Sequence, residues 1–338
     1  MSSKQILVTG GAGYIGSVTA LELVDAGYDV VIADNLSRGR RDAGILREQP
    51  ERLRVVDLLD TEALVRVMKE RPFDAVIHFA AFIAVGESMK FPEMYFHNNT
   101  AGSLSLLTAM IRGGVQNIVF SSTAAVYGMP AHMPIRESEP YAAVNAYGES
   151  KVMVEKMLDW FDQIHAVRSV CLRYFNACGA DPAGRAGECH EPETHLIPLL
   201  LRAAKTGNPI TLFGDDYPTP DGTCIRDYIH VTDLARAHIA AVEHLCGGGE
   251  SKRYNAGTGH GFSVRQVRDA VAEITGLEVP FTMGPRREGD PPMLVADSTR
   301  LQEELGWKPE YSSLEAIVET AWAWMSEHQT HARTLTAR

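Results

Sequence analysis

A glycine-rich turn directly after a short apolar run is the feature that most constrains how this chain folds. Residues 6–8 (ILV) form the apolar run, and residues 9–16 (TGGAGYIG) follow it. Gly10 and Gly13 permit a tight turn and a close backbone approach to a pyrophosphate, while Gly16 lets a helix pack closely on the strand. The segment predicts a strand–turn–helix unit that binds a dinucleotide at the helix N-terminus.

Short apolar segments alternate with helical patterns along the first half of the chain. The predicted strands are residues 6–8, 30–33, 53–56, 75–79, 117–120 and 169–172, and the predicted helices are residues 14–26, 62–70, 99–111 and 146–161. Continuous apolar strands alternating with helices indicate a parallel sheet covered on both faces. The expected fold is therefore α/β, a doubly wound parallel (Rossmann) sheet with its ligand site at the carboxyl ends of the strands.

The pattern changes after about residue 175, where long loops rich in Gly, Pro and Asp appear. A helix at residues 196–205 and a strand at 210–213 are predicted there, and the capping-box spacing of Ser263 and Gln266 starts a further helix. We predict three parts of the chain. They are an NAD-binding Rossmann domain at residues 1–176, a smaller α/β substrate-binding domain at 177–330 with some segments returning to the sheet, and a tail at 331–338.

Composition disfavours several classes of protein. The chain has 43 acidic and 32 basic residues, a net charge of −11, which argues against nucleic acid or an anionic membrane as the main partner. No apolar stretch approaches the ~20 residues that span a bilayer, and the N-terminus does not resemble a cleavable signal peptide. Five cysteines without a CxxC pair favour reduced thiols, so we expect a cytoplasmic protein.

Two acidic residues that follow predicted strands indicate which dinucleotide is bound. Asp34 lies eighteen residues beyond Gly16, where a carboxylate accepts the ribose hydroxyls of NAD and repels the 2′-phosphate of NADP. Three arginines nearby, at positions 38, 40 and 41, leave NADP as an alternative, although a solvated basic loop explains them better. Asp57 suits the adenine amino group, or else it forms the turn after the third strand.

A tyrosine and a lysine one helical turn apart predict the chemistry. Tyr147 and Lys151 are neighbours on one face of the predicted helix at 146–161, for which Asn145 is a suitable N-cap. A phenol needs roughly 4 kcal/mol of differential stabilisation to become a base near neutral pH. An adjacent ammonium together with a positive nicotinamide ring supplies that order of magnitude. Thr123, after the fifth strand, can hold the substrate oxygen, so the sequence predicts hydride transfer.

These residues resemble the extended short-chain dehydrogenase/reductase superfamily and, within it, the UDP-glucose 4-epimerases. The resemblance runs from Leu7 to about Trp324. It rests on residues 8–17, 78–81, 85–88, 98–99, 147–151, 172–176, 226–231 and 285–290. It implies an isomerase that oxidises a UDP-sugar transiently at C4 with tightly bound NAD and returns the hydride to the other face of a 4-keto sugar. It also implies a homodimer.

The resemblance implies site residues by role. Catalysis would depend on Tyr147 as the base, with Lys151 and Thr123. The implied NAD contacts are Gly10, Gly13, Tyr14, Ile15, Asp34, Asn35, Asp57, Leu58, Phe79, Ala80, Asn98, Lys151 and Phe175. The implied nucleotide-sugar contacts are Thr123, Tyr147, Asn176, His195, Thr211, Phe213, Arg226, Arg287, Asp290 and Leu294.

Several of these residues leave alternatives open. Arg226 and Arg287 suit a diphosphate because their guanidinium groups bind oxyanions in a fork, but salt bridges to local aspartates would also explain them. Leu294 stands beside the sugar at a position that varies in the family, and we expect room there for an N-acetyl group at C2.

Four other functions fit parts of the sequence: a nucleotide-sugar 4,6-dehydratase, a UDP-pentose 4-epimerase, an NAD-sensing regulator and a metal hydrolase. A nucleotide-sugar 4,6-dehydratase needs an acid/base pair directly after Thr123, where this chain has Ala124 and Ala125. A UDP-xylose/UDP-arabinose 4-epimerase stays open because its C4 chemistry is the same. An NAD-sensing regulator would not need the tyrosine–lysine pair. Cys189, His190 and His195 fit no standard zinc spacing, so no metal is predicted.

Overall fold

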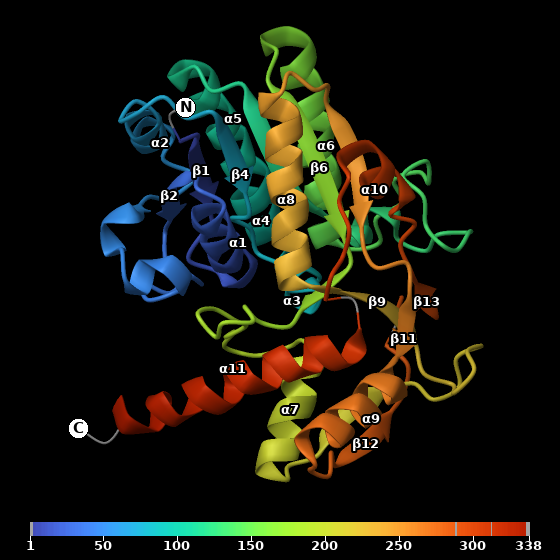
Figure 1. The fold of residues 1–338 in the computed structure, drawn as a ribbon. Helices are drawn as coiled ribbons and strands as arrows, with labels where there is room; N and C mark the ends of the chain where they lie inside the picture. Colours follow the sequence, from blue (N-terminus) through green and yellow to red (C-terminus); the bar gives the residue numbers. More distant parts are fainter. Residues whose placement is uncertain (1–2, 288, 312, 336–338) are drawn as a thin grey trace.

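The computed structural model describes residues 3–287, 289–311 and 313–335 and is built around a seven-stranded parallel sheet (Figure 1). The strand order is β10-β6-β5-β4-β1-β2-β3. The strands are β1 (Gln5–Thr9), β2 (Asp29–Asp34), β3 (Leu53–Val55), β4 (Ala75–His78), β5 (Asn117–Thr123), β6 (Arg168–Tyr174) and β10 (Lys252–Ala256). The predicted doubly wound α/β fold is confirmed.

Helices cover both faces of this sheet. One face carries α1 (Tyr14–Asp25) and α8 (Val231–Cys246), and the other carries α2 (Thr61–Met68), α5 (Gly102–Gly113) and α6 (Ala146–His165). Successive residues of β1 point to opposite faces, so Ile6 packs with α1 and α8 while Leu7 packs with the other three helices. Strands buried on both sides explain why these segments are continuously apolar.

Local capping fixes where several helices begin. The Asp60 side chain accepts a hydrogen bond from the backbone N–H of Ala63 and starts α2. Ser263 and Gln266 form the predicted capping box at the start of α9 (Val264–Thr275).

The remaining short helical segments are η1 (Gly44–Arg47), η2 (Pro50–Arg52), α3 (Val85–Ser88), α4 (Pro92–Tyr95), the π-helical η3 (Phe96–Ala101), η4 (Ala124–Tyr127) and α10 (Thr299–Leu305).

A smaller part lies at one end of the molecule, where α7 (Leu196–Thr206), α9 and α11 (Leu314–Leu335) gather (Figure 1). Its strands are β7 (Asn176–Cys178), β8 (Ile210–Phe213), β9 (Ile225–His230), β11 (Gly261–Ser263), β12 (Phe281–Gly284) and β13 (Met293–Leu294). The chain leaves the large sheet after β6, near the expected domain boundary, and returns to it with α8 and β10. Residues 336–338 of the expected tail lie outside the described part.

Helices of the described residues are all too short or too polar to cross a bilayer.

Candidate active site

The glycine turn joins β1 to α1 in a conformation that requires glycine. Gly10 has a φ of 73°, and a Cβ there would lie 2.5 Å from the backbone nitrogen of Ala80. A Cβ at Gly16 would collide with the carbonyl oxygen of Gly10. Helix α1 therefore packs directly on the turn, as the sequence predicted for Gly16.

The N-terminus of α1 fits an anion. Its N-cap, Gly13, provides no side-chain hydrogen bond, and its first turn has no acidic residue, so the open N–H groups and the helix dipole are available to a phosphate. A Cβ at Gly13 would meet the carbonyl oxygen of Gly10 at 3.3 Å and nothing else within 4 Å among the described residues. This turn can therefore accept the pyrophosphate of a dinucleotide.

Two carboxylates lie at the carboxyl ends of β2 and β3. Asp34 Oδ2 accepts a hydrogen bond from the Ala12 N–H at 3.0 Å, which places the carboxylate against the glycine turn. Burial raises the pKa of Asp34, and the hydrogen bonds from Leu36 and Ala12 oppose that shift. The Asn35 side chain donates to Asp57 Oδ2 at 2.8 Å. The three predicted residues Asp34, Asn35 and Asp57 thus form one polar edge beside the turn.

Two aromatic residues of the expected cofactor set, Phe79 and Tyr14, contact residues far away in the sequence. Phe79 follows β4, and its ring centre lies 4.6 Å from that of His238 in α8. The hydroxyl of Tyr14 donates to the carbonyl oxygen of Gly179 at 2.6 Å and links α1 to the loop after β7. Each aromatic ring is therefore held by a residue distant in sequence.

The other expected cofactor residues are held by packing or by polar contacts. Ile15 is partly buried in the core on the α1 and α8 face. Leu58 is buried, and its Cβ would lie 3.3 Å from a Cβ at Gly102. The Asn98 amide donates to Asn99 Oδ1 at 2.9 Å.

Thr123, Tyr147 and Lys151 come from β5 and the first turns of α6. Asn145 is the N-cap of α6, as predicted, and its side chain accepts a hydrogen bond from the Gly148 N–H at 2.8 Å. The Lys151 Nζ lies 5.9 Å from the centre of the Tyr147 ring. Thr123 ends β5 and hydrogen-bonds Tyr147, so the three side chains form one cluster.

Burial dominates the acid–base properties of this cluster. It raises the pKa of Tyr147, and the hydrogen bond with Thr123 only opposes that shift. Burial also lowers the pKa of Lys151 to about 7, against the raising effect of Glu155. In the protein without a nucleotide, burial therefore outweighs the hydrogen bond from Thr123, which favours the phenolate of Tyr147.

A buried ion pair behind the cluster was not predicted. Arg173 and Glu155 are almost fully buried, with 2.7 Å between Nη2 and Oε2. Glu155 also accepts hydrogen bonds from the hydroxyls of Ser122 and Tyr141. Arg173 belongs to the segment 172–176 that supports the family resemblance. Nothing in the sequence indicated that Glu155, two turns along α6, would be the partner of Arg173.

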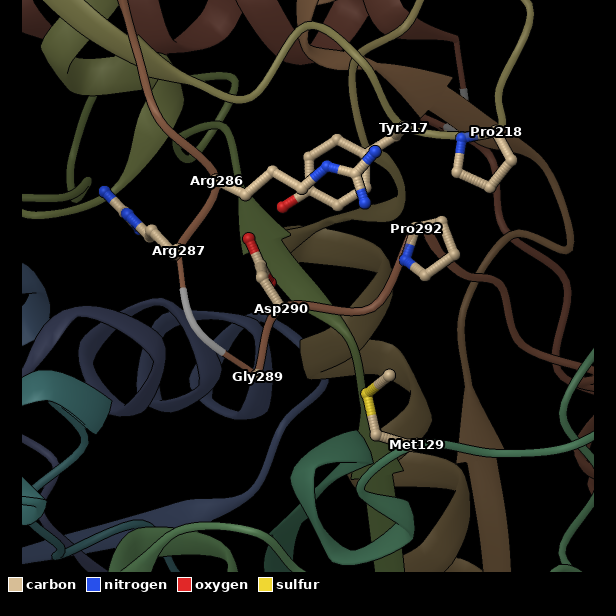
Figure 2. Close-up of a pocket in the computed structure, with 8 residues that line it drawn as sticks. All are labelled: Met129, Tyr217, Pro218, Arg286, Arg287, Gly289, Asp290 and Pro292. Carbon is tan, nitrogen blue, oxygen red and sulfur yellow. The ribbon is translucent and has the colours of Figure 1, made fainter.

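A pocket of about 470 Å³ lies between the smaller part of the molecule and the loop that follows η4 (Figure 2). It is lined by Met129, Tyr217, Pro218, Arg286, Arg287, Gly289, Asp290 and Pro292. The sequence predicted Arg287 and Asp290 but missed Arg286, whose guanidinium lies 4.5 Å from the Tyr217 ring centre. Arg286 and Arg287 both belong to the motif at residues 285–290. The position of Arg286 in the sequence did not show that it also lines the pocket.

Four predicted substrate residues lie at this pocket or contact residues that line it. Arg226 Nη2 bonds Asp290 Oδ1 at 2.6 Å, so the salt bridge considered as the alternative is present. The Arg287 guanidinium lies over the Phe213 ring, 4.2 Å from its centre. These contacts fix the positions of both arginines at or beside the pocket.

Three further predicted residues contact β9 or the small core that contains Ala124. Asn176 in β7 donates to the carbonyl oxygen of Asp227 at 3.0 Å. Leu294 in β13 pairs with Arg226 of β9, and both Leu294 and Phe175 pack on the small core that contains Ala124. Leu294 therefore packs against the same small core as Phe175.

Thr211 and His195 do not line the pocket. The Thr211 hydroxyl is exposed and lies 3.4 Å from that of Thr282 on β12. His195 precedes α7 and bonds Glu188 through Nδ1. Burial lowers the pKa of His195, but the hydrogen bond and charge of Glu188 outweigh it and raise the pKa.

Comparison with known proteins matches this arrangement to one family. Residues 6–257 match the NAD dependent epimerase/dehydratase family. A UDP-glucose 4-epimerase of Lacticaseibacillus casei is 49% identical over 324 residues, which cover 96% of this chain and 97% of the relative.

Solved structures of UDP-glucose 4-epimerases are also similar to this chain. UDP-glucose 4-epimerase from Brucella ovis in complex with NAD has a TM-score of 0.90 at 46% identity, covering 95% of this chain and 98% of that one. The enzyme from Bifidobacterium longum in complex with NAD+ and UDP has a TM-score of 0.90 at 38% identity, covering 96% and 99%.

Proposed function

Because the chain belongs to the NAD dependent epimerase/dehydratase family, we propose that it interconverts UDP-glucose and UDP-galactose using tightly bound NAD. It is an isomerase. The single observation that carries this function is the cluster of Thr123, Tyr147 and Lys151 on the same sheet as the glycine turn. A chain that only sensed NAD would not need this cluster, and Ala124 and Ala125 replace the carboxylates of a dehydratase.

The glycine turn and the polar edge beside it hold the cofactor. Gly10, Gly13 and the N-terminus of α1 bind the pyrophosphate, and Asp34 binds the ribose hydroxyls of the adenosine. The remaining proposed contacts are Tyr14, Ile15, Asn35, Asp57, Leu58, Phe79, Ala80, Asn98, Lys151 and Phe175. Bound NAD supplies the acceptor and then the donor of a hydride at sugar C4.

Tyr147 acts as the general base and then as the general acid. Its phenolate oxygen removes the proton of the sugar 4-hydroxyl while the hydride leaves C4, and it returns the proton when the hydride comes back. Thr123 holds the same sugar oxygen in line with Tyr147. Because burial raises the pKa of the free phenol, the positive charge needed for the phenolate comes from outside the Tyr147–Thr123 pair.

The nucleotide end of the substrate stays fixed while the sugar turns. Arg226 and Arg287 bind the diphosphate near Asp290 and Phe213, and Asn176, His195 and Thr211 complete the proposed set. The 4-keto sugar turns about this anchor and presents its other face to the same hydride. The net redox change is zero, so the cofactor does not need to leave.

A second substrate is favoured by Leu294. This partly buried side chain packs against the small core that contains Ala124, and it is smaller than the tyrosine that some members of the family have at this position. We propose that UDP-GlcNAc and UDP-GalNAc also react. Turnover of UDP-GlcNAc beside UDP-glucose tests this, and no conversion where UDP-glucose reacts quickly would exclude it.

The protein is proposed to be a homodimer. Exposed apolar side chains form stripes on α5 and α6, which pack together on one side of the sheet (Figure 1). They are Leu104, Ile111, Met153, Trp160 and Ile164. A twofold axis would bury both stripes against their copies. Sedimentation should give a dimer, and Trp160→Glu should give a monomer.

The cytoplasm is the proposed compartment. The described cysteines form no disulfide, and reduced thiols persist there. The net charge of −11 supports the proposal that neither nucleic acid nor an anionic membrane is a partner. We also propose that residues 1–176 mainly bind NAD and residues 177–330 mainly bind the nucleotide sugar.

Purified protein incubated with UDP-galactose, with no NAD added, tests the function. Chromatographic separation should show UDP-glucose appearing until the two sugars reach equilibrium. UDP-arabinose in a parallel reaction measures the pentose alternative. Absence of conversion with and without added NAD would reject the proposed activity.

A further inference from the structure

Four metal-ligating side chains converge in the loop that leads into α7. They are Glu188, His190, Glu193 and His195, and one ligand atom from each lies within 4.8 Å of the others. Glu188 Oε1 lies 3.0 Å from Nδ1 of His190 and also bonds Nδ1 of His195. Glu193 Oε1 lies 4.0 Å and 3.8 Å from the same two nitrogens. Both imidazoles therefore present the same ring nitrogen to both carboxylates.

The separations suit a single four-coordinate ion. Metal–ligand bonds of about 2.0–2.1 Å in a tetrahedron place neighbouring ligand atoms roughly 3.4 Å apart. The distances within this tetrad lie on both sides of that value, so small side-chain movements would complete the geometry. Two imidazole nitrogens and two carboxylate oxygens are a ligand set that zinc accepts.

The negative charges of the two buried carboxylates also favour binding of a cation. The side chains of Glu188 and Glu193 are only 6% and 3% exposed. Among the described residues, the ion pairs of these two carboxylates involve the histidines and no lysine or arginine. A divalent ion would neutralise both carboxylates at once and leave both imidazoles neutral.

We propose that Glu188, His190, Glu193 and His195 bind one divalent transition-metal ion, with zinc the preferred ion. The ion is structural, because four protein ligands would fill a tetrahedral shell and leave no open position for a substrate.

The loop held by the ion joins three parts of the molecule. The His190 ring lies edge-on to Tyr14 at the glycine turn, with 6.2 Å between the ring centres. The Trp324 indole N–H of α11 donates to the carbonyl oxygen of Glu188 at 3.0 Å. Coordination through Nδ1 also leaves the Nε2 proton of His195 free for the nucleotide-sugar contact proposed above, which lies outside the pocket of Figure 2. That last consequence rests on the proposed function, whereas metal binding itself does not.

Direct metal binding tests the site without reference to activity. Untagged full-length protein is dialysed against a chelator and titrated with Zn²⁺ or Co²⁺, and bound metal is counted by mass spectrometry. We expect one ion per chain and the intense visible absorption of tetrahedral Co²⁺. No saturable binding of either ion by the wild-type protein would overturn the proposal.

Matched variants in the same loop locate the ion. Glu188→Gln and His190→Ala should each weaken binding by more than about 100-fold, beyond the roughly 10- to 100-fold that outer-shell changes cost. Glu191→Gln removes an exposed carboxylate of the loop and Cys189→Ser removes a nearby thiol, and both should bind as the wild type does. Equal affinity in Glu188→Gln and Glu191→Gln would contradict the assignment, as would loss of the ion in Cys189→Ser. Circular dichroism checks that each variant is folded.

Discussion

Lys151 reaches from α6 to β5, where its Nζ donates a hydrogen bond of 2.8 Å to the carbonyl oxygen of Ser121. The ammonium group is thereby held beside the Tyr147 ring and away from solvent, since Lys151 is only 3% exposed. Both groups on which the proposed chemistry depends are therefore buried before any ligand binds.

The first prediction concerns pH and Lys151. Its pKa is lowered by burial from 10.5 to about 7, so between these values the unfolded chain holds a proton that the folded protein does not. The contribution of Lys151 to stability should therefore improve as pH rises from about 7 to 10.5, by roughly 1.4 kcal/mol per pH unit. Urea unfolding of nucleotide-free wild type and Lys151→Met, compared at several pH values, measures this slope. A constant difference between the two proteins across that range would contradict the burial effect.

The second prediction concerns the base. Tyr147→Phe removes the hydroxyl but keeps the ring, so kcat should fall by about 10²–10⁴-fold or more while bound NAD is retained. Nucleotide released from the denatured variant measures retention. Tyr28→Phe is the matched control, because the Tyr28 hydroxyl bonds Glu243 at the surface. Activity of Tyr147→Phe near that of the control would rule out the phenolate assignment.

The third prediction concerns the glycine turn. A Cβ at Gly10 would collide with the backbone of Phe79 and Ala80, so Gly10→Ala should lower the NAD content of the purified protein several-fold. Gly86→Ala serves as the control, since a Cβ there meets no described atom within 4 Å and its φ is not positive. Equal NAD content in the two variants would show that the turn does not hold the cofactor.

The fourth prediction concerns the buried pair behind the cluster. Glu155→Gln leaves the guanidinium of Arg173 buried without its counter-charge, which should destabilise the protein by about 3–5 kcal/mol. Glu62→Gln breaks the exposed pair with Arg112 and should leave the unfolding midpoint almost unchanged. Urea unfolding of the two variants provides the comparison. Similar midpoints would mean that Arg173 finds another partner.

The sequence predicted the parts of the fold that depend on local pattern. Strands β1, β2 and β4 are buried on both faces and therefore continuously apolar, and the capping box of α9 requires only two residues in the right spacing. Strand β10 was missed because three of the five residues of its sequence, KRYNA, are polar. It is a strand because it pairs with β6, far away along the chain.

In the candidate site too, the sequence predicted the features that depend on neighbouring residues and missed the contacts that depend on tertiary structure. The glycine turn and the N-cap of α6 follow from neighbouring residues, but the ion pair of Glu155 and Arg173 joins a helix to a strand. The spacing of Glu188, His190, Glu193 and His195 matches no standard zinc pattern, and only the folded loop brings the four side chains together. Spacing along the chain could not predict these contacts, because each depends on tertiary structure.

The central claim is that one hydride leaves sugar C4 and returns to the same carbon within one active site. UDP-galactose carrying deuterium at C4, incubated with the purified protein and excess unlabelled NADH in solution, tests this most directly. Mass spectrometry of the UDP-glucose formed should find the deuterium retained at C4. UDP-glucose that has exchanged its deuterium for hydrogen would contradict the account.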